Sequence, residues 1–177
     1  MPNYTKNGKI LAPMTDEEFA QGMETGYFVE EYHKAFVVLL FYTGVRCAEA
    51  LRVVKQQFTL TKENIIFSVL KRLKHGIETP PLTLPQKLPY IQYLLQLIQK
   101  PEGEHMKLFD FCPKTAYNIV SRVFHYPHFF RLSRITNFFA EGYSIAQVRT
   151  WTGLTLKSLD FYIGLVDIKT MGESLLK

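Results

Sequence analysis

Residues 35–42 read Ala35-Phe36-Val37-Val38-Leu39-Leu40-Phe41-Tyr42 and carry no charge. A helix of this composition is apolar on every side, so other elements have to surround it. Thr43-Gly44 follows directly, and a glycine at this place is typical of a helix end. We therefore expect a buried central helix, around which the remaining chain packs.

A length of 177 residues suits one domain with a substantial core and is short for two. We expect a polar N-terminal segment over residues 1–13 and one domain over residues 14–177, with a C-terminal tail from about residue 167. No apolar run approaches the roughly 20 residues that cross a bilayer. The polar start Met1–Lys6 also lacks the apolar centre of a signal peptide. The sequence therefore predicts a cytoplasmic protein without a membrane partner.

The two cysteines, Cys47 and Cys112, lie inside apolar segments and lack the spacing of a metal site or a redox pair. We expect both to be buried thiols in a reducing compartment, and we expect no disulfide, metal or cofactor. The net charge of +5 favours a polyanionic partner, above all a nucleic acid.

Helical signals recur along the chain. Thr15 with Glu18 and Ser144 with Gln147 each have the spacing of a capping box, so a helix is expected to begin at each place. Gly153 is expected to end the second of these helices. Further apolar patterns with helical spacing predict helices over residues 88–98, 113–123, 128–142 and 156–166.

Extended structure is predicted in the middle of the chain. The β-branched run of residues 65–70, the turn signal His75-Gly76 and the apolar residues 82–84 together indicate a β-hairpin. Pro80 and Pro81 cannot donate ladder hydrogen bonds, so the second strand is expected to be an edge or to be interrupted there. Residues 108–111 are expected to form another short extended piece. The predicted fold is mainly α with a small antiparallel β-hairpin or sheet, an α+β class.

One pair of side chains suits a phosphate group, and a second pair roots an arginine at the edge of the core. His128 and Arg131 lie three residues apart in a phenylalanine-rich helical segment, so both project from one helix face. A guanidinium offers a bidentate charged fork, and an imidazole offers a donor or a proton acceptor. Arg46 and Glu49 have the same spacing just after the central helix. Lys71, Arg72 and Lys74 crowd the approach to the hairpin turn, where a solvated charged surface is the alternative interpretation.

In order and approximate spacing, these motifs resemble those of the tyrosine recombinases, the phage-type integrases. The resemblance covers about residue 14 to the C-terminus. The form of the individual segments is similar to that in integrases of archaeal viruses and plasmids. It implies the tyrosine recombinase catalytic-domain fold. It is carried by Thr43–Leu51 as the first-arginine motif, Lys74-His75-Gly76-Ile77 as the hairpin lysine and its turn, His128-Phe129-Phe130-Arg131 as the His-x-x-Arg box, Glu141-Gly142 and Ile145–Val148 as the next helix end and helix start, and Tyr162 at the place of the nucleophile.

The resemblance implies a site-specific DNA recombinase that cleaves and rejoins DNA through a 3′-phosphotyrosyl intermediate, without a metal. The implied partner is double-stranded DNA, bound by a homo-tetramer of weakly associating copies. The implied roles are Tyr162 as nucleophile, Arg46 and Arg131 as phosphate clamps, His128 as base, Lys74 as acid with Lys71 as its substitute, Glu49 as the residue that orients Arg46, and Lys71, Arg72 and Arg134 as DNA contacts.

Two features depart from the family pattern. A histidine or tryptophan usually follows the glycine that ends the capped helix, whereas Leu154 follows Gly153 here. Trp151 is the nearby candidate for that catalytic place, and a core tryptophan is the alternative. Family members also carry an N-terminal domain that clamps DNA, and only about 13 residues precede the first expected helix here. Two alternative functions therefore stay open: nicking and resealing like a type IB topoisomerase, and a catalytically inactive DNA-binding module of the same fold.

Overall fold

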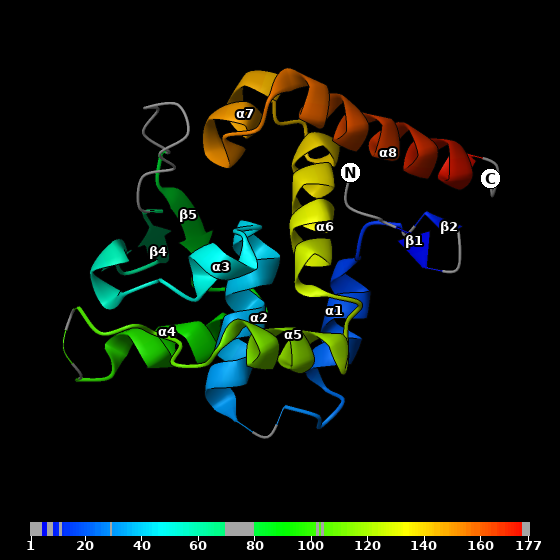
Figure 1. Ribbon diagram of the computed structural model, residues 1–177. Coiled ribbons are helices and arrows are strands. Elements are labelled where there is room, and N and C mark those ends of the chain that lie inside the picture. Colours follow the sequence, from blue (N-terminus) through cyan, green and yellow to red (C-terminus); the bar gives the residue numbers. More distant parts are fainter. Residues whose placement is uncertain are drawn as a thin grey trace.

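The computed structural model describes the backbone of residues 5–6, 9–10, 12–28, 30–69, 80–101, 103 and 105–174, and the side chains of these residues from 12 to 166. Helices dominate (Figure 1): α1 (Asp16–Met23), α2 (Glu31–Thr43), α3 (Cys47–Ala50), α4 (Ile91–Gln99), α5 (Pro113–Ser121), α6 (Pro127–Ala140), α7 (Ile145–Thr152) and α8 (Leu156–Ser174). The strands are β1 (Thr5–Lys6), β2 (Lys9–Ile10), β3 (Phe58–Leu60), β4 (Asn64–Phe67) and β5 (Leu82–Pro85). The predicted α+β class, mainly helical, is confirmed.

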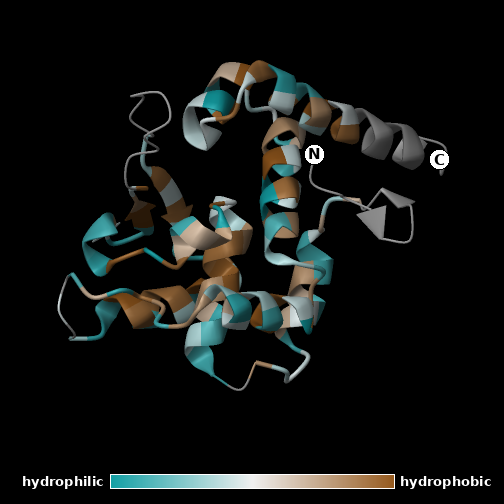
Figure 2. Cartoon of the chain, viewed as in Figure 1, coloured by the Kyte–Doolittle hydropathy of each residue, from teal (hydrophilic) through white to brown (hydrophobic). Residues whose placement is uncertain are grey.

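The helix α2 forms the centre of the domain. Every residue from Ala35 to Thr43 is buried, and α2 packs against both α4 and α6. In Figure 2 brown, hydrophobic residues are frequent on α2 and on α4. The prediction of a helix buried on every side is therefore confirmed, and burial of this surface supplies much of the driving force for folding.

The first helix fastens onto this centre through its capped end. Thr15 and Glu18 form the predicted capping box at the start of α1. Phe19 then stacks on Phe41 of α2, with 3.8 Å between ring centroids. The backbone N–H of Met14 donates to the Ser133 hydroxyl of α6 over 2.8 Å. These contacts bind the start of the domain to both central helices.

The small sheet has the order β3-β4-β5 and is antiparallel throughout. The predicted pairing of β4 with β5 is confirmed, with Ile65 opposite Leu84, and β5 is an edge strand of this sheet. The strand β3 was not predicted, because it is only 3 residues long and follows a polar 3-10 helix over Lys55–Gln57. The residues that join β4 to β5 include Lys71, Arg72 and Lys74, and they lie outside the described residues.

The expected extended piece over residues 108–111 is not a strand. Only an isolated bridge between Lys107 and Val54 forms next to it, with a hydrogen bond of 2.8 Å from the Leu108 N–H to the Val53 carbonyl. Phe109 is buried and packs edge-to-face on Phe36, with ring centroids 5.1 Å apart. Phe109 therefore fills the core from a segment without ladder pairing.

The C-terminal half is built on α6. This helix packs against α2, α5, α7 and α8, and Figure 1 shows α7 and α8 across its C-terminal end. Both predicted signals of α7 are confirmed: the Ser144–Gln147 capping box at its start and Gly153 at its end. The helix α8 runs on to Ser174, past residue 167, where the sequence predicted a tail. Within the part of the chain that the structure describes, every helix is too short or too polar to cross a membrane.

The prediction that both cysteines are buried was wrong. Cys47 is half-buried and Cys112 is exposed. Pro113 occupies the first position of α5, so Cys112 becomes its N-cap residue at the surface. A contact of 3.4 Å between the Cys112 thiol and the Thr115 hydroxyl lowers the pKa of that thiol. A helix start therefore decided the exposure of Cys112, against the apolar character of its neighbours.

Candidate active site

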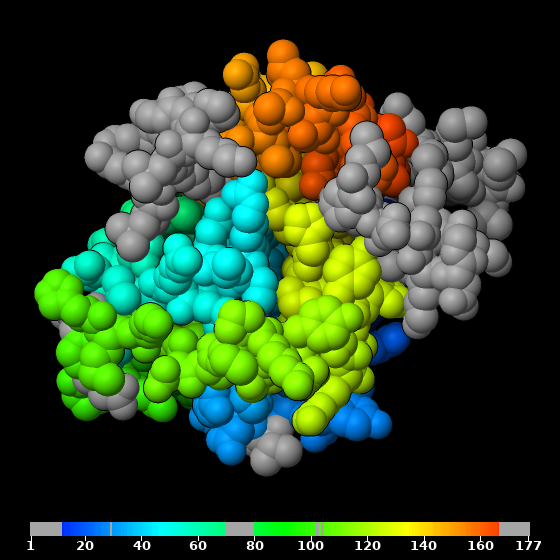
Figure 3. All heavy atoms as spheres, viewed as in Figure 1, coloured from blue at the N-terminus to red at the C-terminus, as the bar shows by residue number. Residues whose placement is uncertain are grey.

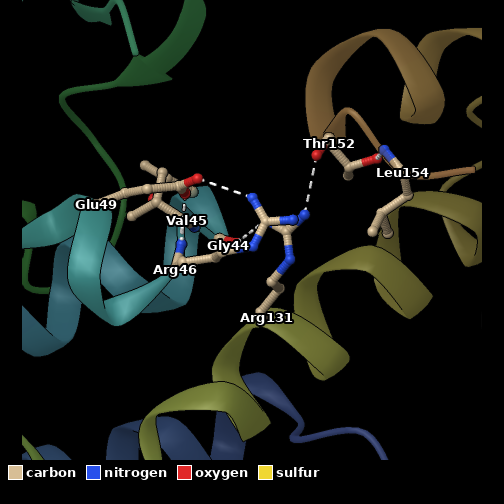
Figure 4. A network of polar contacts seen from close by, with 8 residues as sticks. Gly44, Val45, Arg46, Glu49, Arg131, Thr152 and Leu154 are labelled. Carbon is tan, nitrogen blue, oxygen red and sulfur yellow. Dashed lines mark hydrogen bonds and ion pairs between the residues drawn. The ribbon is translucent and has the colours of Figure 1, made fainter. Parts of the chain in front are cut away.

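Arg131 is the most deeply buried of the charged residues predicted to form the site, with 1% of its surface exposed. One terminal nitrogen of its guanidinium, Nη1, donates to the Gly44 carbonyl at 2.8 Å, and the other, Nη2, donates to the Thr152 carbonyl at 3.0 Å (Figure 4). These carbonyls come from the ends of α2 and α7, while Arg131 comes from α6. The guanidinium is therefore fixed between three helices rather than borne on a surface.

Gly44 makes this arrangement sterically possible. Its φ of 60° and ψ of 21° are left-handed, a conformation that glycine adopts without a side-chain penalty. A Cβ placed on Gly44 would lie 3.0 Å from Cβ of Arg134 and 3.8 Å from Cα of Arg131. The glycine that ends α2 therefore also lets α6 approach closely enough for Arg131 to reach the Gly44 carbonyl.

Arg46 lies two residues beyond this carbonyl and is far more exposed. It is the N-cap residue of the one-turn helix α3, and 44% of its side-chain surface is accessible. Glu49 accepts two hydrogen bonds from it, one from the backbone N–H and one from Nη1, each over 2.8 Å (Figure 4). The expected pairing of Arg46 with Glu49 is confirmed. The carboxylate thus holds Arg46 at the protein surface beside the buried Arg131.

His128 shares the environment of both arginines. It lies one turn before Arg131 on α6 and is half-buried. Burial is the main cause that lowers its pKa below 6.5, followed by the charges of Arg131 and then Arg46. The charges of Arg131 and Arg46 both act on this imidazole, so His128 lies near the two arginines. His128 is therefore mainly neutral at pH 7, the form that can accept a proton. That the three side chains form one catalytic site stays a prediction.

The polar side chains of the candidate site come from two parts of the chain. His128 and Arg131 lie on α6, and Arg46 and Glu49 lie at α3. Figure 3 shows the cyan surface around α3 below the orange surface of α7 and α8, with the yellow surface of α6 beside it. Two guanidinium groups beside a neutral imidazole can bind an anion and receive a proton from a group next to it. Among the described residues, no cluster of at least 3 His, Cys, Asp or Glu side chains could hold a metal ion.

Trp151 lies next to this site but points into the protein. It is 6% exposed, and its indole Nε1 donates to the Thr43 carbonyl over 3.1 Å. This bond joins α7 to the end of α2, one residue before the carbonyl that Arg131 uses. The geometry thus favours the core interpretation of Trp151 over a direct contact with a bound phosphate.

Tyr162 is buried on α8, with 4% of its surface exposed. It lies on the helix face that also buries Leu159 and Leu165, and α8 packs along α6. Its ring contacts that of Phe161 edge-to-face, with centroids 5.6 Å apart. The phenol therefore belongs to the layer that covers α6, the helix that carries His128 and Arg131.

Arg134 makes an ion pair within the chain, and its expected contact with DNA stays a prediction. Its Nη1 and Nη2 donate to the two carboxylate oxygens of Glu141 at 2.8 and 3.4 Å. Its guanidinium also lies over the Phe138 ring, 4.2 Å from the centroid. The two side chains meet because Arg134 and Glu141 are two helical turns apart, on one face of α6 and its C-terminal cap.

Sequence reasoning missed the carbonyls that hold Arg131. A backbone acceptor leaves no mark in residue identity, but both carbonyls belong to a Thr-Gly pair, Thr43-Gly44 and Thr152-Gly153. The repeat of this pair at two helix ends was the available signal.

Comparison with known proteins identifies the fold. No protein-family model matches the sequence, and the search of curated proteins returned no match. Among solved structures, the XerH site-specific recombinase bound to its difH substrate matches with a TM-score of 0.68 and 19% identity, over 87% of this chain and 50% of that one. The XerA recombinase matches with a TM-score of 0.67 and 16% identity, over 94% and 67%. The Tn1549 transposon integrase in complex with circular intermediate DNA matches with a TM-score of 0.56 and 15% identity, over 85% and 60%.

The chain has the tyrosine recombinase catalytic-domain fold. It spans about half the length of the XerH chains that it matches, 50% in one complex and 55% in another. The tyrosine recombinase fold is thus confirmed as the sequence predicted it.

Proposed function

We propose that this chain belongs to the tyrosine recombinase family and is the catalytic part of a site-specific DNA recombinase. The observation that carries the proposal is the convergence of Arg46, Arg131 and His128, three residues from distant parts of the sequence, on a fold whose structural neighbours are recombinases and an integrase. Two guanidinium groups with a neutral imidazole match a phosphodiester, which carries one negative charge and needs no metal to be bound.

The proposed reaction transfers a DNA phosphate to Tyr162 and back. The phenol oxygen attacks phosphorus, a phosphotyrosyl bond forms at the 3′ side, and the bond to the 5′ oxygen breaks. Only about one in a thousand free tyrosine side chains is ionised at neutral pH, so a base has to take the proton. His128 fits this role because its pKa is lowered, mainly by burial. Lys74 is proposed to protonate the leaving 5′ oxygen.

The two arginines are proposed to divide the non-bridging phosphate oxygens between them. Charge builds on these oxygens in the transition state, where fixed donors stabilise it most. Glu49 holds Arg46 through two hydrogen bonds and is proposed to orient it without touching DNA, because a carboxylate near the phosphate would repel it. Lys71 and Arg72 are proposed as further contacts to the DNA backbone.

The proposed partner is double-stranded DNA, and the proposed working form is a tetramer on DNA. Exchange between two duplexes needs paired cuts on each, which weakly associating copies can supply once bound. Most of the affinity is expected from phosphate contacts, so binding should fall steeply as salt is raised.

The deciding experiment traps the covalent intermediate. Wild-type protein is incubated with nicked suicide substrates, and the covalent adduct is measured on a denaturing gel. Tyr162→Phe should abolish the adduct, whereas Tyr143→Phe, on an exposed turn outside the site, should retain it. An adduct that survives in Tyr162→Phe would assign the nucleophile to another residue.

Burial of Tyr162 favours a second candidate, an inactive DNA-binding module of the same fold. Salt-sensitive DNA binding without any adduct from the wild type would support it. Relaxation of supercoiled DNA by a monomer, with adduct formation but no exchange, would instead support a topoisomerase-like activity.

A further inference from the structure

The two ends that hold Arg131 are built alike. Thr43 is the last residue of α2 and Thr152 the last of α7, and each is followed by a left-handed glycine with φ and ψ of 60° and 21° at Gly44 and 63° and 21° at Gly153. In both helices the glycine N–H donates to the carbonyl four residues earlier, over 2.9 Å at Gly44 and 2.8 Å at Gly153. The same cap therefore occurs twice, on either side of one guanidinium.

Each threonine hydroxyl fastens its own cap. Thr43 Oγ1 donates to the Leu39 carbonyl at 2.5 Å and accepts from the Val45 N–H at 3.3 Å. Thr152 Oγ1 donates to the Val148 carbonyl at 2.6 Å and accepts from the Leu154 N–H at 3.3 Å. Both side chains are buried, at 0% and 1% exposure. The hydroxyls thus tie the last helical turn to the chain that leaves it.

The two caps are also joined to each other. Trp151 of α7 donates to the Thr43 carbonyl, and Arg131 bridges the Gly44 and Thr152 carbonyls. Each helix end carries a partial negative charge that stabilises a nearby cation. Two such ends around one guanidinium fix the plane of Arg131 and offset the cost of burying its charge.

We propose that Thr43 and Thr152 are positioning residues: their hydroxyls hold the two Thr-Gly caps so that the Gly44 and Thr152 carbonyls orient Arg131 for the transition state. This inference rests on the proposed function. It deepens that function by assigning the orientation of the second arginine to two helix ends, with Trp151 as the bond between them.

The test compares substitutions of buried threonines that make the same hydrogen bond at different positions of the fold. Thr152→Val and Thr43→Val remove a buried hydroxyl with little change of volume. Thr152→Ser retains the hydroxyl. Thr136→Val is the matched control, because Thr136 is 1% exposed and its Oγ1 also donates to a carbonyl four residues earlier, Leu132 at 2.9 Å, but it lies in α6 and caps neither carbonyl.

Thr152→Val and Thr43→Val should each slow single-turnover cleavage about tenfold, with the half-saturating DNA concentration unchanged, because orientation acts on the transition state. Thr136→Val and Thr152→Ser should stay within about twofold of wild type. A general loss of packing would slow Thr136→Val as much as Thr152→Val. Equal rates in those two variants would overturn the proposal.

A second measurement does not depend on catalysis. Hydrogen exchange of the Arg131 guanidinium, followed by NMR with ¹⁵N-arginine and assigned with Arg131→Lys, should be slow in wild type, Thr136→Val and Thr152→Ser, and faster in Thr43→Val and Thr152→Val. If the wild type forms no adduct but exchange follows this order, the recombinase function fails and the positioning of Arg131 stands. If exchange is unchanged in both valine variants, the positioning role is wrong.

Discussion

Arg46 and Arg131 carry the same functional group but are held in opposite ways. Arg131 is 1% exposed, on the 14-residue helix α6, with backbone carbonyls as acceptors. Arg46 has 44% of its side chain exposed, on a helix of 4 residues, with a carboxylate as acceptor. A backbone acceptor is fixed by the fold, whereas a carboxylate can turn with its side chain. Arg131 is therefore part of the structure as well as of the site, and Arg46 belongs to the site alone.

The largest effect is expected from Arg131→Ala. This change opens a cavity between three helices and leaves the Gly44 and Thr152 carbonyls without their donors, so the free energy of unfolding should fall by about 3 kcal/mol. Cleavage should be lost as well. Urea denaturation monitored by circular dichroism measures the first effect, and the covalent adduct assay measures the second.

The control for Arg131→Ala is Arg131→Lys, which keeps the charge but cannot reach both carbonyls with one ammonium. It should recover part of the stability and little of the cleavage. Full stability in Arg131→Ala would show that the bonds to the two helix ends are not structural, and would remove the distinction between the arginines.

Arg46→Ala should separate activity from stability. Cleavage should fall about a hundredfold or more, the usual loss when one preorganised donor to a developing charge is removed. The free energy of unfolding should change by less than about 1 kcal/mol, since the pair with Glu49 is partly exposed and screened by solvent.

Glu49→Gln serves as the companion variant of Arg46→Ala. It keeps the shape of the residue that holds Arg46 but removes its charge, so its cleavage rate should lie between those of wild type and Arg46→Ala. A loss of stability in Arg46→Ala as large as that in Arg131→Ala would contradict the comparison.

The smallest expected effect is a change in the pKa of His128. Its pKa is lowered below 6.5 in the folded protein, mainly by burial and then by Arg131 and Arg46. The unfolded chain thus binds the proton more tightly, so stability is fully present above pH 6.5 and declines as the pH falls from there toward the folded pKa. Arg46→Ala removes one of the two charges and should raise the pKa of His128, and NMR titration of its ring protons measures this.

The control variant for this titration is Lys157→Ala, which removes a positive charge at an exposed position of α8. It should leave the titration of His128 where it is in wild type. An unchanged His128 pKa in Arg46→Ala would mean that Arg46 does not share its environment. Urea denaturation across about pH 5 to 7.5 supplies the matching stability curve.

Much of the fold follows from local patterns. The charge-free run of α2, the capping boxes at Thr15 and Ser144 and the glycine ends at Gly44 and Gly153 all act within a few residues, so the sequence predicts them directly. The errors occur where distant contacts override local character. Cys112, expected to be buried, is exposed by a helix start, and the unpredicted strand β3 forms by pairing with β4.

By itself, the sequence determined most of the helices and the pairing of β4 with β5, because helix caps, apolar periodicity and turn residues are local properties. Tertiary structure alone decided that Arg131 is enclosed while Arg46 stays exposed, and that Trp151 turns inward. The reason is that the acceptors are main-chain carbonyls, identical in every residue, and only the packing of α2 and α7 against α6 brings them to the guanidinium.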